Sequence, residues 1–280
     1  MRQKISPALH LEEVQASFDE SRDERLVQLL RCVVKHLHAF VEETNLTRDE
    51  WLAGIQFLTE TGRKCDDSRQ EFILFSDVLG VSMLVEMVNQ NATDVATDAT
   101  VLGPFYLPNS PRMTMGSFIG SEGDGVDPLT LAGTVRNAHG EALENATIEV
   151  WQVAPNGLYD VQDAKIQGPN YRATFLTDCD GTFEIRTTRP VDYQIPTDGP
   201  VGAMLNATGR QSWRAAHTHL RVAREGYKTL VTHVFDASST RLKSDAVFGV
   251  RDSLIIDMNK GLAHFDITLD SDMTSLSNGF

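Results

Sequence analysis

The chain has 280 residues, 41% of them hydrophobic and 23% charged, which is typical of a globular protein with one large or two modest domains. Its formal net charge of −14 argues against nucleic acid as a partner, because a phosphate backbone requires Lys and Arg on the contact face. No run of about 18 apolar residues occurs, so we expect no membrane span. The first residues lack an apolar signal-peptide core, and three cysteines, Cys32, Cys65 and Cys179, are widely spaced. We therefore expect a cytoplasmic protein with reduced thiols, no disulfide framework and no zinc site.

Helical patterns occupy residues 1–95. Capping boxes of the form Ser/Thr-x-x-Glu begin at Ser21, Thr47 and Ser68, and apolar residues recur at helical spacing after the first box. Nearly every residue from 72 to 88 is apolar, and a helix that is apolar on most sides must be buried. The short N-terminal segment offers little to bury it. We therefore predict a helical layer that packs on the rest of the protein and on a second copy of the chain.

The remainder of the chain shows a loop pattern first and a strand pattern after it. Between residues 96 and 128 turn-forming residues dominate and no period survives, which predicts a long linker and pocket loop. After residue 129, short alternating and β-branched segments predict strands at 129–135, 146–153, 182–186, 217–223, 230–235 and 265–269. The sequence thus predicts an α+β protein with an antiparallel β-sandwich over residues 129–280.

Two histidines in one predicted strand form the first candidate site. His217 and His219 are two residues apart, so their imidazoles lie on the same face of the strand and could bind one metal ion. The alternative is two exposed histidines on one face of a sheet. A cupin-like facial triad would need a carboxylate and a third histidine. Only Glu225 and His233 are available, and Glu225 adjoins Gly226 in a predicted turn, so this interpretation is strained.

Tyrosines at strand ends are a second set of candidate ligands. Tyr159 and Tyr193 each follow or begin a predicted β segment. A free phenol has a pKa near ~10. A trivalent cation can hold a phenol deprotonated at neutral pH, because the ion is then the largest local charge. Taken alone, however, such tyrosines are more often core or surface aromatics.

Several motifs together carry a family resemblance. They are Trp151-Gln152 with Gly157-Leu158-Tyr159, then Tyr193-Gln194-Ile195-Pro196, then Arg214-Ala215-Ala216-His217-Thr218-His219. In order and spacing this set resembles the motifs of the intradiol ring-cleavage dioxygenases, and the resemblance runs from about Leu74 to Ile256. Five stretches, 74–80, 102–105, 159–162, 230–233 and 244–250, are most similar to the hydroxyquinol-cleaving branch of that family.

This resemblance implies a complete set of roles. It implies a homodimer formed by the helical layer, with a bound phospholipid, and a β-sandwich that holds one non-haem iron(III). Tyr159 and His217 would be the equatorial iron ligands, and Tyr193 and His219 the axial ones. The substrate would displace Tyr193, and Arg214 would stabilise the developing charge. The reaction implied is cleavage of hydroxyquinol by O2 to 3-hydroxy-cis,cis-muconate, and thence maleylacetate, in the catabolism of aromatic compounds.

The same family positions outline a substrate pocket. Its members are Leu74, Asp77, Leu102, Gly103, Pro104, Phe105, Ile195, Pro196, Thr197 and Arg214. Most are apolar, as a pocket for an aromatic ring requires. Asp77 could accept a hydrogen bond from a third ring hydroxyl, which favours hydroxyquinol, although it could also be a surface or capping aspartate. His233 stands where catechol enzymes commonly have Gln, and it is either close to the metal or a packed histidine.

Two alternatives to hydroxyquinol cleavage stay open at this point. One is the same chemistry on catechol or chlorocatechol. The other is a metal-free β-sandwich binding module with a helical cap, which would be a colourless protein. A phenolate bound to iron(III) would instead give a red-brown colour.

Overall fold

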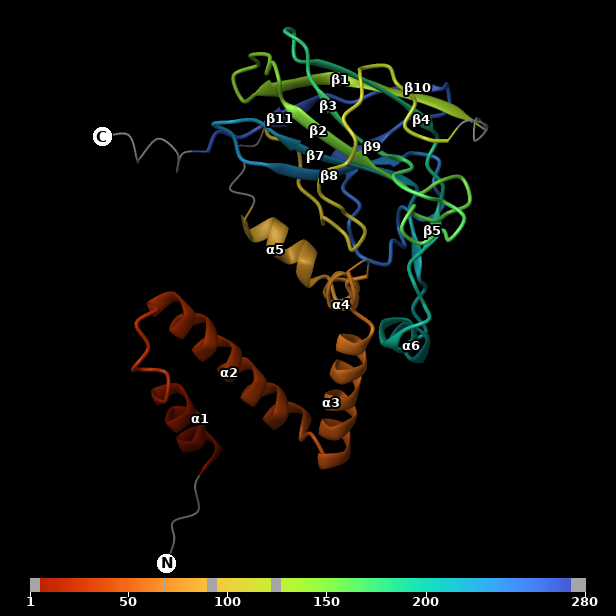
Figure 1. The fold of residues 1–280 in the computed structure, drawn as a ribbon. Coiled ribbons are helices and arrows are strands. Elements are labelled where there is room, and N and C mark those ends of the chain that lie inside the picture. The colour runs from red at the N-terminus through yellow and green to blue at the C-terminus, as the bar shows by residue number, and fades with distance from the viewer. Residues whose placement is uncertain (1–5, 68, 90–94, 122–126, 273–280) are drawn as a thin grey trace, which may run out of the picture. The chain divides into compact units, whose positions relative to one another are not determined.

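The computed structural model describes residues 6–67, 69–89, 95–121 and 127–272 (Figure 1). It divides into a helical unit, Met1–Thr59, and a larger unit, Glu60–Phe280, that contains both helices and sheets. The predicted α+β class is therefore confirmed. Within the described residues, every helix is too short or too polar to cross a bilayer.

Local capping explains where the helices of the first unit begin. The unit contains α1 (Pro7–Ala16), α2 (Glu24–Thr44) and most of α3 (Arg48–Arg63). The predicted cap of α2 at Ser21 was wrong, because the Asp23 carboxylate accepts the Leu26 amide at 2.9 Å and supplies the cap. The box before α3 is confirmed: the Thr47 amide donates to Glu50 at 2.8 Å, and the Glu50 amide donates to the Thr47 hydroxyl at 3.3 Å.

One side of α2 carries a run of apolar side chains that are solvent-exposed in the single chain. These side chains are between 36% and 57% exposed: Leu26, Leu29, Leu30, Val33, Leu37, Phe40 and Val41. They recur at helical spacing, as the sequence predicted. A contiguous apolar face of this kind marks an interaction surface.

The apolar stretch from 72 to 88 forms two helices rather than one. These are α4 (Glu71–Val78) and α5 (Val81–Asn89). Gly80 lies between them with φ of +71°, a left-handed conformation that glycine adopts readily and that ends a helix. The predicted cap at Ser68 lies outside the described residues.

Two sheets and a short ribbon make up the rest of the second unit. The four-stranded sheet contains β1 (Pro128–Asn137), β4 (Thr182–Thr188), β10 (Leu262–His264) and β11 (Ile267–Leu269). The five-stranded sheet has the order β3 (Arg172–Leu176), β2 (Thr147–Trp151), β7 (His217–Ala223), β8 (Leu230–Asp236) and β9 (Ile255–Ile256). A two-stranded ribbon pairs β5 (Tyr193–Gln194) with β6 (Trp213–Arg214). A further helix, α6 (Pro200–Ala207), and a 3-10 turn (Asp252–Leu254) complete the unit.

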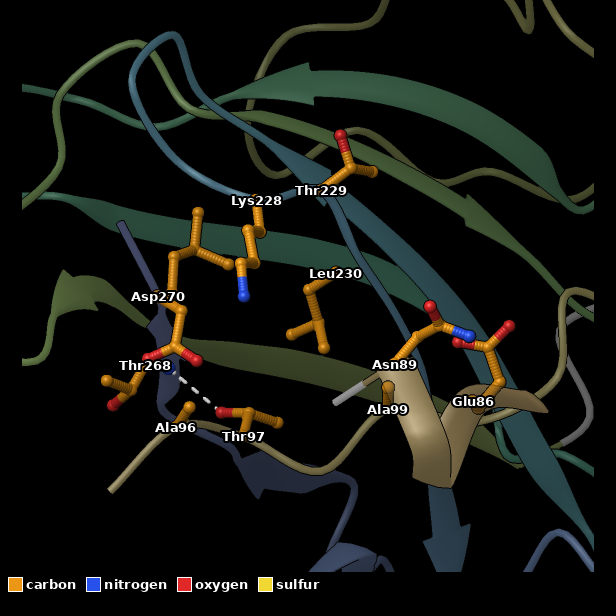
Figure 2. Close-up of a pocket in the computed structure, with 11 residues that line it drawn as sticks. Glu86, Asn89, Ala96, Thr97, Ala99, Lys228, Thr229, Leu230, Thr268 and Asp270 are labelled. Atoms are coloured by element: carbon orange, nitrogen blue, oxygen red, sulfur yellow. Dashed lines mark hydrogen bonds between the residues drawn. The ribbon is translucent and has the colours of Figure 1, made fainter. Parts of the chain in front are cut away.

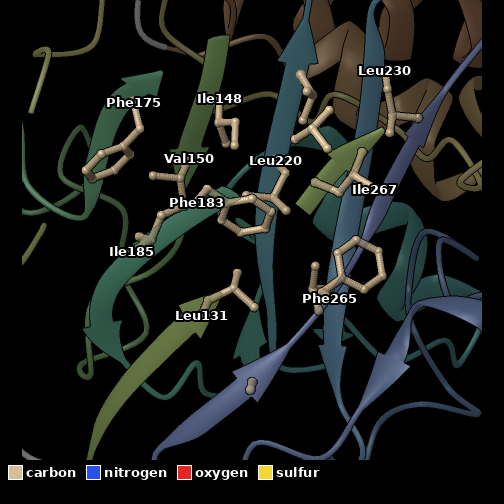
Figure 3. Close-up of a cluster of buried hydrophobic side chains, with 14 of the residues drawn as sticks. Leu131, Ile148, Val150, Phe175, Phe183, Ile185, Leu220, Leu230, Phe265 and Ile267 are labelled. Carbon is tan, nitrogen blue, oxygen red and sulfur yellow. The ribbon is translucent and has the colours of Figure 1, made fainter. Parts of the chain in front are cut away.

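The two sheets share one hydrophobic core, as a sandwich requires (Figure 3). Leu131 and Ile185 of the four-stranded sheet lie in the same buried cluster as Ile148 and Leu220 of the five-stranded sheet. Most strand pairs are antiparallel, as predicted. The β1–β10, β1–β11 and β8–β9 pairs are parallel, because short strands from the C-terminal segment return beside β1 and β8 in the same direction.

Strand alternation directs a second set of side chains away from that core. In β7, Leu220 and Val222 belong to the core cluster, so His217 and His219 face the opposite side of the sheet. The strand register places Trp151 of β2 on one side of His219 and His233 of β8 on the other. Arg172 of β3 pairs with Trp151 in turn. We call this row of four directly paired residues, Arg172, Trp151, His219 and His233, the histidine rung.

Candidate metal centre

The structure brings the four predicted metal ligands together. The Tyr159 hydroxyl lies 3.1 Å from the Tyr193 hydroxyl and 3.0 Å from Nε2 of His219. Nε2 of His219 lies 3.1 Å from Nε2 of His217. All four side chains are buried. An ion about 2.0–2.1 Å from each nitrogen or oxygen ligand would set neighbouring donors roughly 3 Å apart, so the spacing fits a shared metal ion.

The histidines are held as neutral donors. Nδ1 of His217 lies 2.6 Å from the Ala215 carbonyl, which can only accept, so Nδ1 carries the proton and Nε2 has a free lone pair. Burial, with the nearby Arg214 charge, lowers the pKa of His217 to about 3. Burial and the neighbouring His217 also lower the pKa of His219 well below its usual range. A neutral imidazole is the form that binds metal.

The phenols respond to burial in the opposite direction. Burial raises the pKa of Tyr159 well above its usual value, and the neighbouring Tyr193 adds to the rise. Burial also raises the pKa of Tyr193, although the Arg214 charge opposes this. In the protein alone both phenols are therefore neutral, and only a strong positive charge between them would remove their protons. Two neutral imidazoles with two ionisable phenols are a donor set that fits ferric iron.

Aromatic rings and a glycine enclose these donors. The Trp151 ring is stacked on His219, with ring centroids 4.6 Å apart and an interplanar angle of 14°. Phe105 is stacked on Tyr159 at 4.7 Å. Gly103 has φ of +76°, and a Cβ atom there would lie 3.4 Å from Cε1 of His219. The segment that contains Gly103 and Phe105 therefore lies against the donor cluster, as expected of pocket residues.

The other predicted pocket residues differ in burial. Leu74 of α4 and Ile195 after β5 belong to one buried cluster, and Asp77 of α4 is only 2% exposed. In contrast, Leu102 and Thr197 are exposed, and Pro104 and Pro196 are half-buried. The contribution of all the predicted pocket residues to substrate binding stays a prediction.

Arg214 is fixed beside the cluster by a buried ion pair. It pairs with Tyr193 across the β5–β6 ribbon, and its Nη1 lies 3.5 Å from the Tyr193 hydroxyl. Its Nε donates to Oδ1 of Asp245 at 3.1 Å, and Asp245 also accepts the Gly249 amide at 2.9 Å. Burial would lower the pKa of Arg214, but Asp245 and the two phenols raise it overall. Arg214 is therefore a permanent cation whose orientation depends on Asp245. The sequence motifs included Asp245 but did not indicate this role.

A second carboxylate fixes the relative positions of two candidate ligands. Asp192 precedes Tyr193, and its Oδ1 accepts the amide of Ala216, the residue before His217, at 2.9 Å. The same oxygen accepts the Ser239 hydroxyl. Asp192 therefore ties the start of β5 to the start of β7. No motif in the sequence marked it, because its partners are distant along the chain.

His233 lies next to the donor cluster, and its role there stays a prediction. Its ring centroid is 4.1 Å from that of His219 and 4.6 Å from that of His217. The side chain is fully buried, and neither ring nitrogen has a hydrogen-bond partner in the described part of the chain. Glu225, the carboxylate that a facial triad would need, lies in an exposed turn after β7.

A small cavity elsewhere in this unit is distinct from the donor cluster. Its volume is about 170 Å³, and its lining includes Glu86, Lys228, Leu230 and Asp270 (Figure 2). None of the predicted site residues lines it. This cavity therefore does not mark the candidate metal site, which is identified by the close spacing of its donor atoms.

Comparisons with known proteins agree with this geometry. Residues 101–273 match the family model described as Dioxygenase, and residues 23–97 match the one described as Catechol dioxygenase N terminus. The chain is 44% identical over 250 residues to a hydroxyquinol 1,2-dioxygenase of Rhizobium sp., covering 89% of this chain and 84% of the relative. It is 46% identical over 250 residues to that of Rhodococcus opacus, covering 88% and 82%. The crystal structure of hydroxyquinol 1,2-dioxygenase from Pseudomonas putida matches with a TM-score of 0.85 and 41% identity, covering 95% of this chain and 99% of that one.

A fold of helices with a mixed β-sandwich, and a buried cluster of imidazoles and phenols, define an intradiol type of dioxygenase. The chain belongs to the intradiol ring-cleavage dioxygenase family. Non-haem iron is the metal expected of that family.

Proposed function

We propose that this protein cleaves hydroxyquinol, benzene-1,2,4-triol, between its two adjacent hydroxyl-bearing carbons. The product is 3-hydroxy-cis,cis-muconate, which tautomerises to maleylacetate, and both atoms of O2 enter it. Tyr159, Tyr193, His217 and His219 hold the ferric iron. The observation that carries the proposal is the continuous series of donor atoms 3.0–3.1 Å apart beside the fixed cation Arg214.

When bound, ferric iron supplies the charge that keeps the phenols ionised and makes the bound diol reactive toward O2. The protein's own residues divide the remaining work. Tyr193 is the phenol within 3.5 Å of Arg214, so the Arg214 cation would stabilise negative charge on the Tyr193 oxygen. Nη2 of Arg214 is buried without a partner among the described residues, and it can donate to a substrate oxygen. Trp151 and Phe105 hold the rings of His219 and Tyr159 in place and exclude water.

Asp77 supports hydroxyquinol rather than catechol as the substrate. Its Oδ1 is buried and has no hydrogen-bond partner within the described residues. Burial raises the pKa of Asp77, while Ser82 and the Arg214 charge oppose the rise, which places Asp77 within electrostatic range of Arg214. A carboxyl group there can pair with a third ring hydroxyl. A site built to pair a hydroxyl also disfavours the analogue that lacks it, because its own polar group is then left unpaired.

The test compares two substrates in one variant. Asp77→Ala should lower kcat/KM for hydroxyquinol by about ten- to a hundredfold, since a hydrogen bond to a charged group is worth roughly 1.5–3 kcal/mol. Catechol turnover should stay unchanged or rise, and the iron colour should persist. Asp67→Ala is the matched control, because Asp67 is an exposed aspartate shortly before α4. Equal losses on the two substrates would show that Asp77 is structural and would favour a catechol enzyme.

The proposal extends to assembly. We propose a homodimer in which a helical domain, residues 1–95, forms the interface, with residues 96–128 as linker and pocket loop and 129–280 as the catalytic domain. The exposed apolar face of α2 supports it, as do the exposed apolar side chains of α4 and α5. A phospholipid at this surface and a cytoplasmic location are expectations of the family resemblance and of the composition.

A further inference from the structure

We infer that His217, His219 and His233 form a second donor set that overlaps the first, three imidazoles suited to a divalent transition-metal cation of the zinc and cobalt class. The inference relies on the proposed function only in that both donor sets share His217 and His219. A divalent ion bound this way would exclude ferric iron and leave Tyr159 and Tyr193 uncoordinated.

The three imidazoles are already gathered on one face of the sheet. His219 and His233 are direct partners in the β7–β8 register, and His217 lies two residues before His219. One potential ligand atom from each of the three lies within 4.8 Å of the others, and the His217–His219 pair is at 3.1 Å. All three side chains are at most 2% exposed. Three imidazoles with one open position are an established ligand set for zinc.

His233 is the member that the ferric site does not use. A buried imidazole normally has at least one hydrogen bond, but both nitrogens of His233 are unpartnered in the described structure. Tetrahedral binding at about 2.0–2.1 Å would set the nitrogens roughly 3.3 Å apart, so the rings must close by about 1.5 Å. The His233 ring can turn toward the pair without breaking a hydrogen bond, because none holds it. The strand pairing keeps its backbone in place.

Ferric iron and a divalent cation differ in the donor atoms that they prefer. Phenolate oxygens are hard, charged donors that suit a small trivalent cation. Imidazole nitrogens suit zinc, copper and nickel as well as iron, so the phenolates distinguish the two ions. A divalent ion is less able than a trivalent one to hold two phenolates, so it gains more from a third imidazole. The buried cluster therefore offers Tyr159 and Tyr193 to ferric iron, and His233 to a divalent ion.

Titration of the metal-free protein with Co²⁺ tests this inference, because the visible bands of bound Co²⁺ report its ligands without any turnover. The wild-type protein should bind one Co²⁺ per chain. His233→Gln should weaken Co²⁺ binding by at least about tenfold, the lower bound for losing even an outer-shell partner. The same variant should keep the red-brown ferric colour. Tyr159→Phe should lose that colour but keep its Co²⁺ affinity within about threefold. His139→Gln, in an exposed turn, is the control.

A second variant, His233→Ala, distinguishes the loss of a ligand from misfolding of the protein. His233→Ala should regain Co²⁺ affinity when free imidazole is added, because the small ligand can enter the space of the missing ring. Three outcomes would overturn the inference: no Co²⁺ binding by the wild type, equal Co²⁺ affinity in wild type and His233→Gln, or a Tyr159→Phe variant as impaired toward Co²⁺ as His233→Gln. A wild type that binds Co²⁺ through His233 but never develops ferric colour would support this inference and refute the proposed function.

Discussion

The buried ion pair between Arg214 and Asp245 allows a quantitative prediction. Their side chains are 3% and 2% exposed, so neither charge is solvated by water. Asp245→Asn keeps the size of the side chain and one acceptor oxygen, but it leaves the Arg214 cation buried without its counter-ion. Breaking such a pair by removing one partner costs about 3–5 kcal/mol. Since 1 kcal/mol shifts the Tm of a unit of this size by roughly 2–4 °C, the Tm should fall by about 6–20 °C.

Thermal unfolding of the metal-free protein at pH 7, followed by circular dichroism, measures this shift without involving iron. Asp266→Asn is the matched control, because Asp266 is 57% exposed and pairs with the exposed His264. The control should move the Tm by less than about 2 °C. In the double variant Arg214→Met/Asp245→Asn, the loss should be smaller than the sum of the single losses by about 2 kcal/mol. A near-normal Tm for Asp245→Asn, or strictly additive losses, would refute the reasoning.

Four further outcomes are expected. His219→Ala should lose most of its iron by metal analysis, and full occupancy would remove His219 from the ligands. Light scattering at micromolar concentration should give about twice the 31.0 kDa of one chain, whereas a monomer would contradict the proposed dimer. Gly199→Ala should destabilise the protein by about 1–3 kcal/mol, because its Cβ would lie 2.4 Å from the Glu71 carboxylate; an unchanged Tm would contradict this. Hydrogen bonds from Arg69 and Lys64 lower the pKa of Asp198 to about 2, so its contribution is present above about pH 4 and is lost as the pH falls toward 2. Asp198 is 63% exposed, so Asp198→Asn should cost less than about 1 kcal/mol at pH 7, and the difference in Tm should vanish at low pH.

Sequence patterns predicted those elements whose structure is set locally. The strand at His217–Ala223 has its predicted bounds, and the Thr47 capping box forms as predicted, because the residues that determine each lie within a few positions. The break at Gly80 was missed, since the apolar pattern continues across it. The strand Arg172–Leu176 was also missed: it is short, and its edge position depends on pairing with a distant segment, Thr147–Trp151.

The same distinction holds for the site. The four donor residues carry recognisable motifs, and the fold brings them into contact. No motif indicated the roles of the groups that hold the donors in place. Asp245 meets Arg214 from 31 residues away, and Asp192 meets Ala216 from 24 residues away. The loop lengths between such partners are not constrained by any local pattern, so only the folded structure shows these contacts.

The histidine rung has a consequence for how this sequence can change. Its members occupy matched positions on four adjacent strands, and the alternation that turns His219 outward is the same alternation that turns Leu220 inward. Inserting or deleting a single residue in β7 would therefore move a leucine to the metal face and a histidine into the core. Such a change would disrupt the hydrophobic core and the metal site together. A substitution changes one position of this strand, whereas a change of length moves every residue after it to the other face. We therefore expect insertions and deletions to be confined to the loops that follow the strand ends.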